Sequence, residues 1–137
     1  MIFLDTNVVS ELVAPGGTEE VGSWYAANRS RLNLSIIVVA ELLSGAELMR
    51  PSRVREAYLQ SYGLVFASLP PPEPVDSFVA KAAAAMRGAS RRSGVQLDLA
   101  DALIAATAAR HDAPLATRNI KDFEATGLTL IDPWNAP

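Results

Sequence analysis

The chain has 137 residues, a length typical of one folded domain, and its 50% hydrophobic and 20% charged residues exclude an intrinsically disordered chain. It has no cysteine and one histidine, which excludes disulfides, thiolate zinc sites and multi-histidine metal centres, so any metal must be bound by oxygen ligands. The net charge of -3 contrasts with the basic surface of most nucleic-acid-binding domains, so the positions of the acidic residues matter.

The first part of the chain alternates short apolar runs with helical patterns. Residues 2–4 predict a strand, and the apolar residues after it recur at helical spacing until residues 15–17 break the pattern. A second amphipathic helix is expected around residues 21–25. A strand at 32–35 then leads into a helix that lasts from about 37 to 49.

The middle of the chain is punctuated by prolines. Pro51 ends one helix, and another begins at Ser52 with Val54, Tyr58 and Tyr62 on one face. Residues 64–67 are a third predicted strand, which the prolines at 70–72 terminate. No repeat, low-complexity tract or linker divides the sequence, so we expect a single domain over residues 1–137.

The last part of the chain repeats the alternation of helices and strands. A long helix is expected over residues 78–92 and an alanine-rich helix over 98–110. Two further strands are predicted at 115–116 and 128–131, separated by a tight segment at 117–123. Short apolar strands that alternate with helices indicate an α/β fold, in which helices cover both faces of a parallel sheet.

Four acidic residues lie where strands end or helices begin: Asp5, Glu41, Asp101 and Asp122. In an open parallel sheet these positions share the carboxyl edge, where ligands bind. Carboxylates grouped without a counter-ion repel one another, and a divalent cation removes that penalty. Hard oxygen ligands favour Mg²⁺ or Mn²⁺ over zinc, and such ions polarise phosphodiesters and activate water. The pattern therefore predicts phosphodiester hydrolysis.

Structural roles compete with this interpretation for each acid. Asp5 could cap the helix that follows it, and Asp122 could be a turn residue. Asp98 and Asp101 have the spacing of a capping box, for which we expect Asp98 to be the cap. Asp101 would then either complement the helix dipole or take part in chemistry. A charge at Glu41, inside an apolar segment, favours a functional role.

Four segments resemble the motifs of the PIN-domain family, and their order and spacing resemble the VapC-type toxins of bacterial toxin-antitoxin pairs. The segments are Asp5-Thr6-Asn7, Ala40-Glu41-Leu42, the run from Asp101 to Thr107, and Thr117-Arg118-Asn119 followed by Asp122-Phe123. The resemblance covers nearly the whole chain. Each motif alone is weak, whereas the four in this order are specific.

The resemblance implies a three-layer α/β/α fold with a five-stranded parallel sheet. It also implies a Mg²⁺- or Mn²⁺-dependent endoribonuclease that acts as a toxin, forms a homodimer and binds a cognate antitoxin. The catalytic and metal-binding residues implied are Asp5, Glu41, Asp101 and Asp122, with Asp5 and Asp101 as the main metal ligands. The supporting polar residues implied are Thr6, Asn7, Thr117 and Asn119.

The net negative charge is compatible with an RNA substrate. Setting aside the four candidate acids leaves twelve basic and eleven acidic residues, and a bound cation adds further positive charge. Arg87 and Arg91 lie one turn apart on a predicted helix, and Arg118 and Lys121 flank the fourth acid. These four are candidate RNA contacts, with ordinary solvated surface charges as the alternative.

Two other classes of function remain to be weighed. A receiver-like signalling domain also gathers acids and Mg²⁺ at a sheet edge, but it needs a phosphate-accepting aspartate after the third strand, where this chain has Ser68. A catalytically silent interaction domain is the second alternative. The chain starts without a basic leader and contains no apolar run near the roughly 20 residues that cross a membrane, so we expect a cytoplasmic protein.

Overall fold

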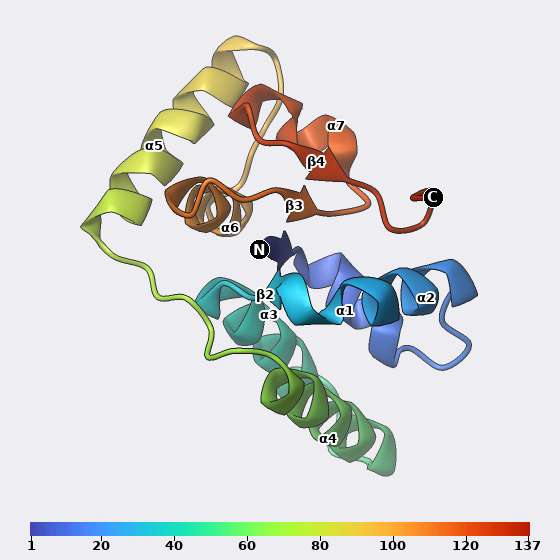
Figure 1. Cartoon of the computed structure of the whole chain (residues 1–137). Coiled ribbons are helices and arrows are strands. Elements are labelled where there is room, and N and C mark those ends of the chain that lie inside the picture. Colours follow the sequence, from blue (N-terminus) through green and yellow to red (C-terminus); the bar gives the residue numbers. More distant parts are fainter.

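The computed structural model describes residues 1–137, with a parallel four-stranded sheet between layers of helices (Figure 1). The strands are β1 (Ile2–Leu4), β2 (Leu32–Asn33), β3 (Leu115–Ala116) and β4 (Leu130–Ile131), in the order β2-β1-β3-β4. Strand β1 lies inside the sheet, where all three of its residues are buried. Its register pairs Phe3 with Leu115 and Leu4 with Ala116.

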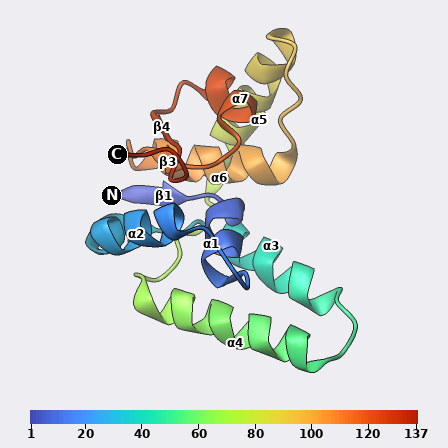
Figure 2. The ribbon, with the colours of Figure 1, turned by 90° about the vertical axis from the view of Figure 1, so that its right-hand side faces the viewer.

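Seven α-helices surround the sheet: α1 (Thr6–Val13), α2 (Glu19–Asn28), α3 (Ile36–Glu47), α4 (Arg53–Ser68), α5 (Ser77–Arg92), α6 (Leu99–Arg110) and α7 (Ile120–Phe123). Short 3-10 helices follow α2 at Arg29–Arg31 and α7 at Glu124–Thr126. Helices α5 and α6 lie on one side of the sheet and α1 and α2 on the other (Figure 1). Helix α4 is outermost and packs on α1 and α3 (Figure 2). None of the helices combines the length and apolar character needed to cross a membrane.

Side-chain caps fix where the helices begin. Asp5, Ser35, Ser52, Asp76 and Asp98 each accept a hydrogen bond from a backbone N–H in the first turn of the helix that follows. Such caps satisfy donors that have no partner inside the helix. Two of the capped helices, α1 and α6, therefore begin at defined residues beside the carboxyl ends of the strands.

Helix α6 is buried on almost every side, as its small side chains allow. Residues 104–108 are all buried, and the helix packs extensively on α5. Thr107 is satisfied within this core because its hydroxyl donates to the carbonyl of Leu103 at 2.7 Å. A single cluster of 26 buried residues joins the sheet to the helices on both faces. The α/β architecture predicted from the sequence is thereby confirmed.

The predicted third strand at residues 64–67 is wrong, and the sheet has four strands instead of five. These residues belong to α4, where Leu64 is 68% exposed and the rings of Tyr62 and Phe66 stack one turn apart. A short apolar run fits a strand or a helix equally well, and here the four-residue spacing of the aromatic rings indicates the helix. After the prolines, Glu73 forms only an isolated parallel bridge with Ser35.

Candidate active site

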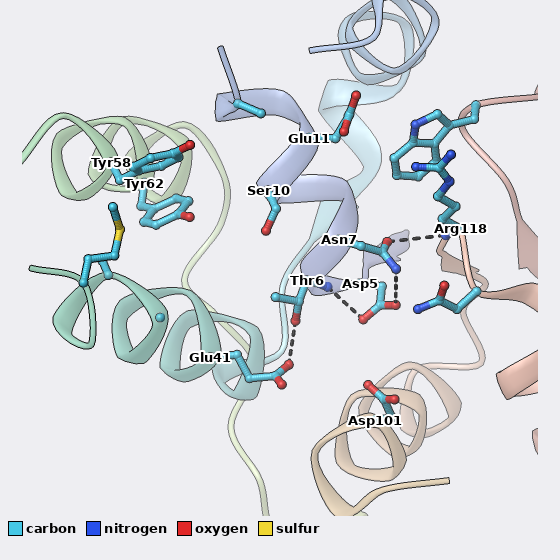
Figure 3. Close-up of a pocket in the computed structure, with 16 residues that line it drawn as sticks. Asp5, Thr6, Asn7, Ser10, Glu11, Glu41, Tyr58, Tyr62, Asp101 and Arg118 are labelled. Atoms are coloured by element: carbon cyan, nitrogen blue, oxygen red, sulfur yellow. Dashed lines mark hydrogen bonds between the residues drawn. The ribbon is translucent and has the colours of Figure 1, made fainter. Parts of the chain in front are cut away.

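A cavity of about 740 Å³ opens at the carboxyl end of β1 and is bounded by α1, α3, α4, α6 and the segment after β3 (Figure 3). Asp5, Glu41 and Asp101 line it from three different elements. In Figure 3 these carboxylates lie around the start of α1. The structure thus brings three of the four predicted acids to one cavity.

Asp5 is positioned by the register of the sheet and by three polar neighbours. Leu4 pairs with Ala116, so the next residues, Asp5 and Thr117, lie side by side beyond the strand ends. One carboxylate oxygen of Asp5 accepts from the Thr6 N–H at 2.8 Å. The other accepts from the Thr117 hydroxyl at 2.7 Å and the Asn7 amide at 3.1 Å. Asp5 therefore both caps α1 and belongs to the candidate site.

The pKa of Asp5 lies above its ordinary value because the carboxyl is buried, an effect that outweighs the hydrogen bonds from Thr117 and Thr6. The nearby negative charges of Glu41 and Asp98 raise this pKa further. A buried carboxylate near other carboxylates favours a proton or a cation as its partner. Asp5 is only 3% exposed, so bulk water screens it little.

Glu41 reaches the site from α3, in the first half of that helix. The Thr6 hydroxyl donates to a carboxylate oxygen of Glu41 at 2.6 Å (Figure 3). This contact connects α3 to the first residue of α1, directly after Asp5. The polar residue inside the apolar segment therefore faces the cavity, as its unusual position suggested.

Asp101 lies in the first turn of α6 and is half-buried. Burial is the main cause that raises its pKa to about 7, followed by the negative charges of Asp5, Asp98, Glu41 and Asp122. A lone acid in a first helical turn would be stabilised in its charged form by the helix dipole. The opposite direction of this shift indicates that burial, together with the neighbouring carboxylates, outweighs the helix dipole. Asp98 is the N-cap of α6, as predicted, and accepts from the Asp101 N–H at 2.8 Å.

A hydrated cation fits the carboxylates better than a closed ligand cage does. No three acidic or histidine side chains lie close enough together to surround an ion directly. Mg²⁺ commonly retains several waters and binds through one or two carboxylates plus substrate phosphate. Asp5 and Asp101 supply such oxygens. Burial and neighbouring negative charges raise the pKa of both residues, and a bound cation would stabilise their charged forms.

The fourth predicted acid, Asp122, lies apart from the other three. It is exposed on the short helix α7 and does not line the cavity, although its charge contributes to raising the pKa of Asp101. Among the supporting residues, Thr6, Asn7 and Asn119 line the cavity. Thr117 is completely buried and contacts Asp5 from behind, so all four lie around the candidate site.

The predicted RNA contacts are divided between two regions. Arg118 lines the cavity with the acids, and its guanidinium lies 5.1 Å from the ring centre of Trp134. Arg87 and Arg91 line a separate hollow at the end of α5, where Arg87 Nε donates to the Leu97 carbonyl at 3.0 Å. Lys121 is exposed on α7. Only Arg118 is placed to meet a phosphate in the cavity.

The cavity also contains residues that were not predicted as parts of a site. They include Ser10, Glu11, Met49, Tyr58, Tyr62 and Trp134. The spacing of Tyr58 and Tyr62 predicts that they lie on one face of a helix. A face that packs on other helices and a face that borders a cavity have the same spacing, so the sequence does not distinguish them. Position relative to α1 and α3, which only the fold defines, distinguishes the two.

We expect Thr117→Val to destabilise the protein by about 1–2 kcal/mol, because the variant loses a buried hydroxyl that donates to a carboxylate. It should also raise the pKa of Asp5 further, since that hydrogen bond lowers it. Weaker Mn²⁺ binding should accompany the change, by about 10–100-fold for a residue that supports a metal ligand. Urea unfolding and Mn²⁺ titration measure both effects, and Thr117→Ser is the control that keeps the hydroxyl. A valine variant with unchanged stability and Mn²⁺ affinity would contradict this role.

Known proteins are similar to this chain in fold and in sequence. Residues 2–127 match the family model described as PIN domain. VapC ribonuclease Y4jK of Sinorhizobium fredii is 38% identical over 138 residues, which cover 98% of this chain and 98% of that protein. Toxin FitB of Neisseria gonorrhoeae is 35% identical over 142 residues, which cover 98% of this chain and 99% of that protein.

Two solved structures extend the comparison. The crystal structure of FitAcB from Neisseria gonorrhoeae has a TM-score of 0.88 at 32% identity, covering 99% of this chain and 100% of that chain. A toxin-antitoxin complex from Klebsiella pneumoniae has a TM-score of 0.76 at 25% identity, with 99% and 100% covered.

The chain belongs to the PIN-domain family. Within that family it is similar, over nearly its whole length, to the toxins that bear the names VapC and FitB. The resemblance seen in the sequence motifs is confirmed.

Proposed function

We propose that this protein is a divalent-metal-dependent endoribonuclease and the toxin of a toxin-antitoxin pair. The observation that carries the nuclease is the convergence of Asp5, Glu41 and Asp101 on one cavity. The other carboxylates contribute to the raised pKa of Asp101, which supports their closeness to it. A relative that bears the name ribonuclease supports RNA as the substrate.

In this proposal Asp5 and Asp101 hold Mg²⁺ or Mn²⁺, with Glu41 as a further acidic group in the cavity and Asp122 outside it, acting only through its charge. The ion would polarise the scissile phosphodiester, activate water and stabilise the leaving oxygen. Thr117, Asn7 and the Thr6 N–H orient the Asp5 carboxylate, so that its geometry is fixed before substrate binds.

The other residues of the cavity would bind and orient the RNA. The Thr6 hydroxyl donates to the Glu41 carboxylate and orients it. Arg118 adds positive charge at the rim and is held over Trp134, which leaves its guanidinium available to a phosphate. Its backbone N–H lies 3.4 Å from the Asn7 side-chain oxygen, which couples this arginine to the segment that starts with Asp5.

We expect the purified chain to cleave single-stranded or looped RNA in Mg²⁺ or Mn²⁺ and to lose that activity in EDTA. The assay compares a labelled single-stranded RNA with a DNA of the same sequence, each with and without metal. A catalytically silent interaction domain would cleave neither, and a receiver-like domain would take up phosphate from a small phosphodonor without cleaving RNA. Full activity in EDTA would contradict the proposed metal dependence.

The partners proposed are a second copy of the chain and a cognate antitoxin. The solved toxin-antitoxin complex with the same fold supports such a partner. We expect a dimer at micromolar concentration and a larger complex when the chain is co-expressed with the product of its neighbouring gene. Light scattering coupled to size exclusion measures both masses. A monomer under both conditions would contradict these partners.

A further inference from the structure

The cavity has two ends with different chemistry. Asp5, Glu41 and Asp101 occupy one end, and Tyr58 and Tyr62 occupy the other (Figure 3). We use the name aromatic end for the part of the cavity lined by these two tyrosines, Gly45, Ala46 and Met49. Acidic chemistry at one end explains hydrolysis of a phosphodiester, but the proposed reaction gives the aromatic end no role.

Helix α3 runs along both ends of the cavity. Glu41 and Gly45 lie four residues apart on α3, and Met49 follows four residues later, just beyond the end of that helix. All three line the cavity. Four residues of α-helix rise about 6 Å, so Gly45 lies about one turn from the acidic group on the same face. A Cβ added at Gly45 meets no atom within 4 Å, which leaves this stretch of the wall open.

The tyrosines form a supported aromatic wall. Tyr62 is 8% exposed, and its ring stacks on Phe66 with centres 6.4 Å apart and an interplanar angle of 20°. The ring of Tyr58 packs against the ring of Tyr62, with centres 6.0 Å apart, and Tyr58 is the more exposed of the two residues. A rigid aromatic surface beside a carboxylate site suits a planar apolar ring better than another phosphate, because neither tyrosine carries positive charge.

We propose that the aromatic end binds the base of a nucleotide next to the scissile phosphate, with Tyr58 as the stacking residue. This inference rests on the proposed ribonuclease function. Stacking on an aromatic ring is a sequence-tolerant way to hold a single-stranded base, because every base has a π-face. The open wall at Gly45 leaves room for that base, and Met49 adds an apolar side chain to the lining.

Abasic RNA tests the proposal directly. An oligoribonucleotide with one mapped cleavage site is prepared with a single abasic ribose at each position on either side of that site. At one of these positions, removal of the base should slow cleavage by the wild type about 5- to 100-fold, the range expected for one stacked base. Tyr58→Ala should slow cleavage of intact RNA by a similar factor and show no further loss on the abasic RNA, whereas Tyr58→Phe should behave as the wild type.

Two glycines provide a matched pair of steric variants. Gly45→Leu should fill the aromatic end and slow cleavage at least about 10-fold, within the range expected for the loss of one stacked base. Gly63→Leu, on α4 outside the cavity, should leave cleavage unchanged. An added Cβ at either position meets no atom within 4 Å, and leucine favours helix, so both variants should fold. Equal cleavage by both variants would overturn the proposal.

Other outcomes also decide the question. Equal cleavage of intact and abasic RNA by the wild type means that the aromatic end does not bind a base. If Gly45→Leu keeps cleavage but no longer binds the co-expressed partner, the aromatic end is a protein-docking surface and the proposal fails. If the wild type cleaves no RNA, the proposed function fails. Fluorescence anisotropy in Ca²⁺ then decides base binding separately, with a single-stranded oligoribonucleotide that is intact or carries one abasic ribose at each position in turn. Equal affinity for the intact RNA and every abasic RNA would overturn the proposal.

Discussion

Replacing Asp101 with asparagine should lower the rate of RNA cleavage at least about 100-fold, equivalent to about 2.7 kcal/mol of transition-state stabilisation. The variant keeps the size of the side chain but loses the charge that a cation needs. Burial and four other carboxylates raise the pKa of Asp101 to about 7, whereas two carboxylates act on Asp5. Single-turnover cleavage in saturating Mg²⁺ measures the loss.

Asp122→Asn provides the matched control for this experiment. Asp122 is exposed and lies outside the cavity, so the same chemical change should cost less than about 10-fold, as expected for a surface charge that acts only through the field. Undiminished cleavage by Asp101→Asn, or an equal loss in both variants, would contradict the assignment of Asp101 as a main metal ligand.

The second large expected effect is on stability: the free energy of unfolding of the metal-free protein should fall as pH rises. The pKa of Asp101 is about 7 in the folded state and near 3.8 in the unfolded chain, so between these values the folded state binds the extra proton. The free energy of unfolding therefore falls as pH rises through this window. The raised pKa of Asp5 acts in the same direction. Allowing for solvent screening of the half-buried Asp101, we expect a loss of ~1–2 kcal/mol between pH 5 and pH 8.

The stability of Asp101→Asn, compared with that of the wild type with and without metal, distinguishes a cation site from an acid that only stabilises a helix terminus. In EDTA at pH 8 the variant should be as stable as the wild type or more stable, because it relieves carboxylate repulsion. An acid that served only the helix dipole would instead cost about 0.3–1 kcal/mol when removed. Metal at a hundred times its dissociation constant should stabilise the wild type by about 2.7 kcal/mol and the variant much less.

Thermal midpoints of the wild type and Asp101→Asn, measured across pH in EDTA and in excess Mg²⁺, test these differences in stability. A variant clearly less stable in EDTA, with the same metal-induced shift as the wild type, would mean that Asp101 is only a helix-terminus residue.

The acidic part of the site was predictable because each carboxylate sits at a fixed place in a local pattern. Asp5 follows β1 directly, and Asp98 and Asp101 occupy the cap and first turn of α6. Strand ends and helix starts meet at the same edge of a parallel sheet, so local sequence implied long-range proximity. Asp122 instead lies on the short helix α7, outside the cavity, and its local sequence does not indicate that position.

The aromatic end and the arginine contact depend on packing that local patterns do not define. Tyr58 and Tyr62 were placed on one helix face, but the extension of α4 through residues 64–67 was mistaken for a strand. Arg118 meets Trp134 only because the chain after β4 returns beside the segment after β3. Contacts between segments far apart in the sequence decide these features.

The most direct test of the metal site is anomalous scattering from crystals of the wild type grown in excess Mn²⁺. We expect a strong anomalous peak in contact with the carboxylates of Asp5 and Asp101, with water completing the coordination. Crystals of Asp101→Asn should lack that peak under the same conditions. A wild-type map with no peak between these two residues, or with its only peak beside Asp122 on α7, would contradict the account.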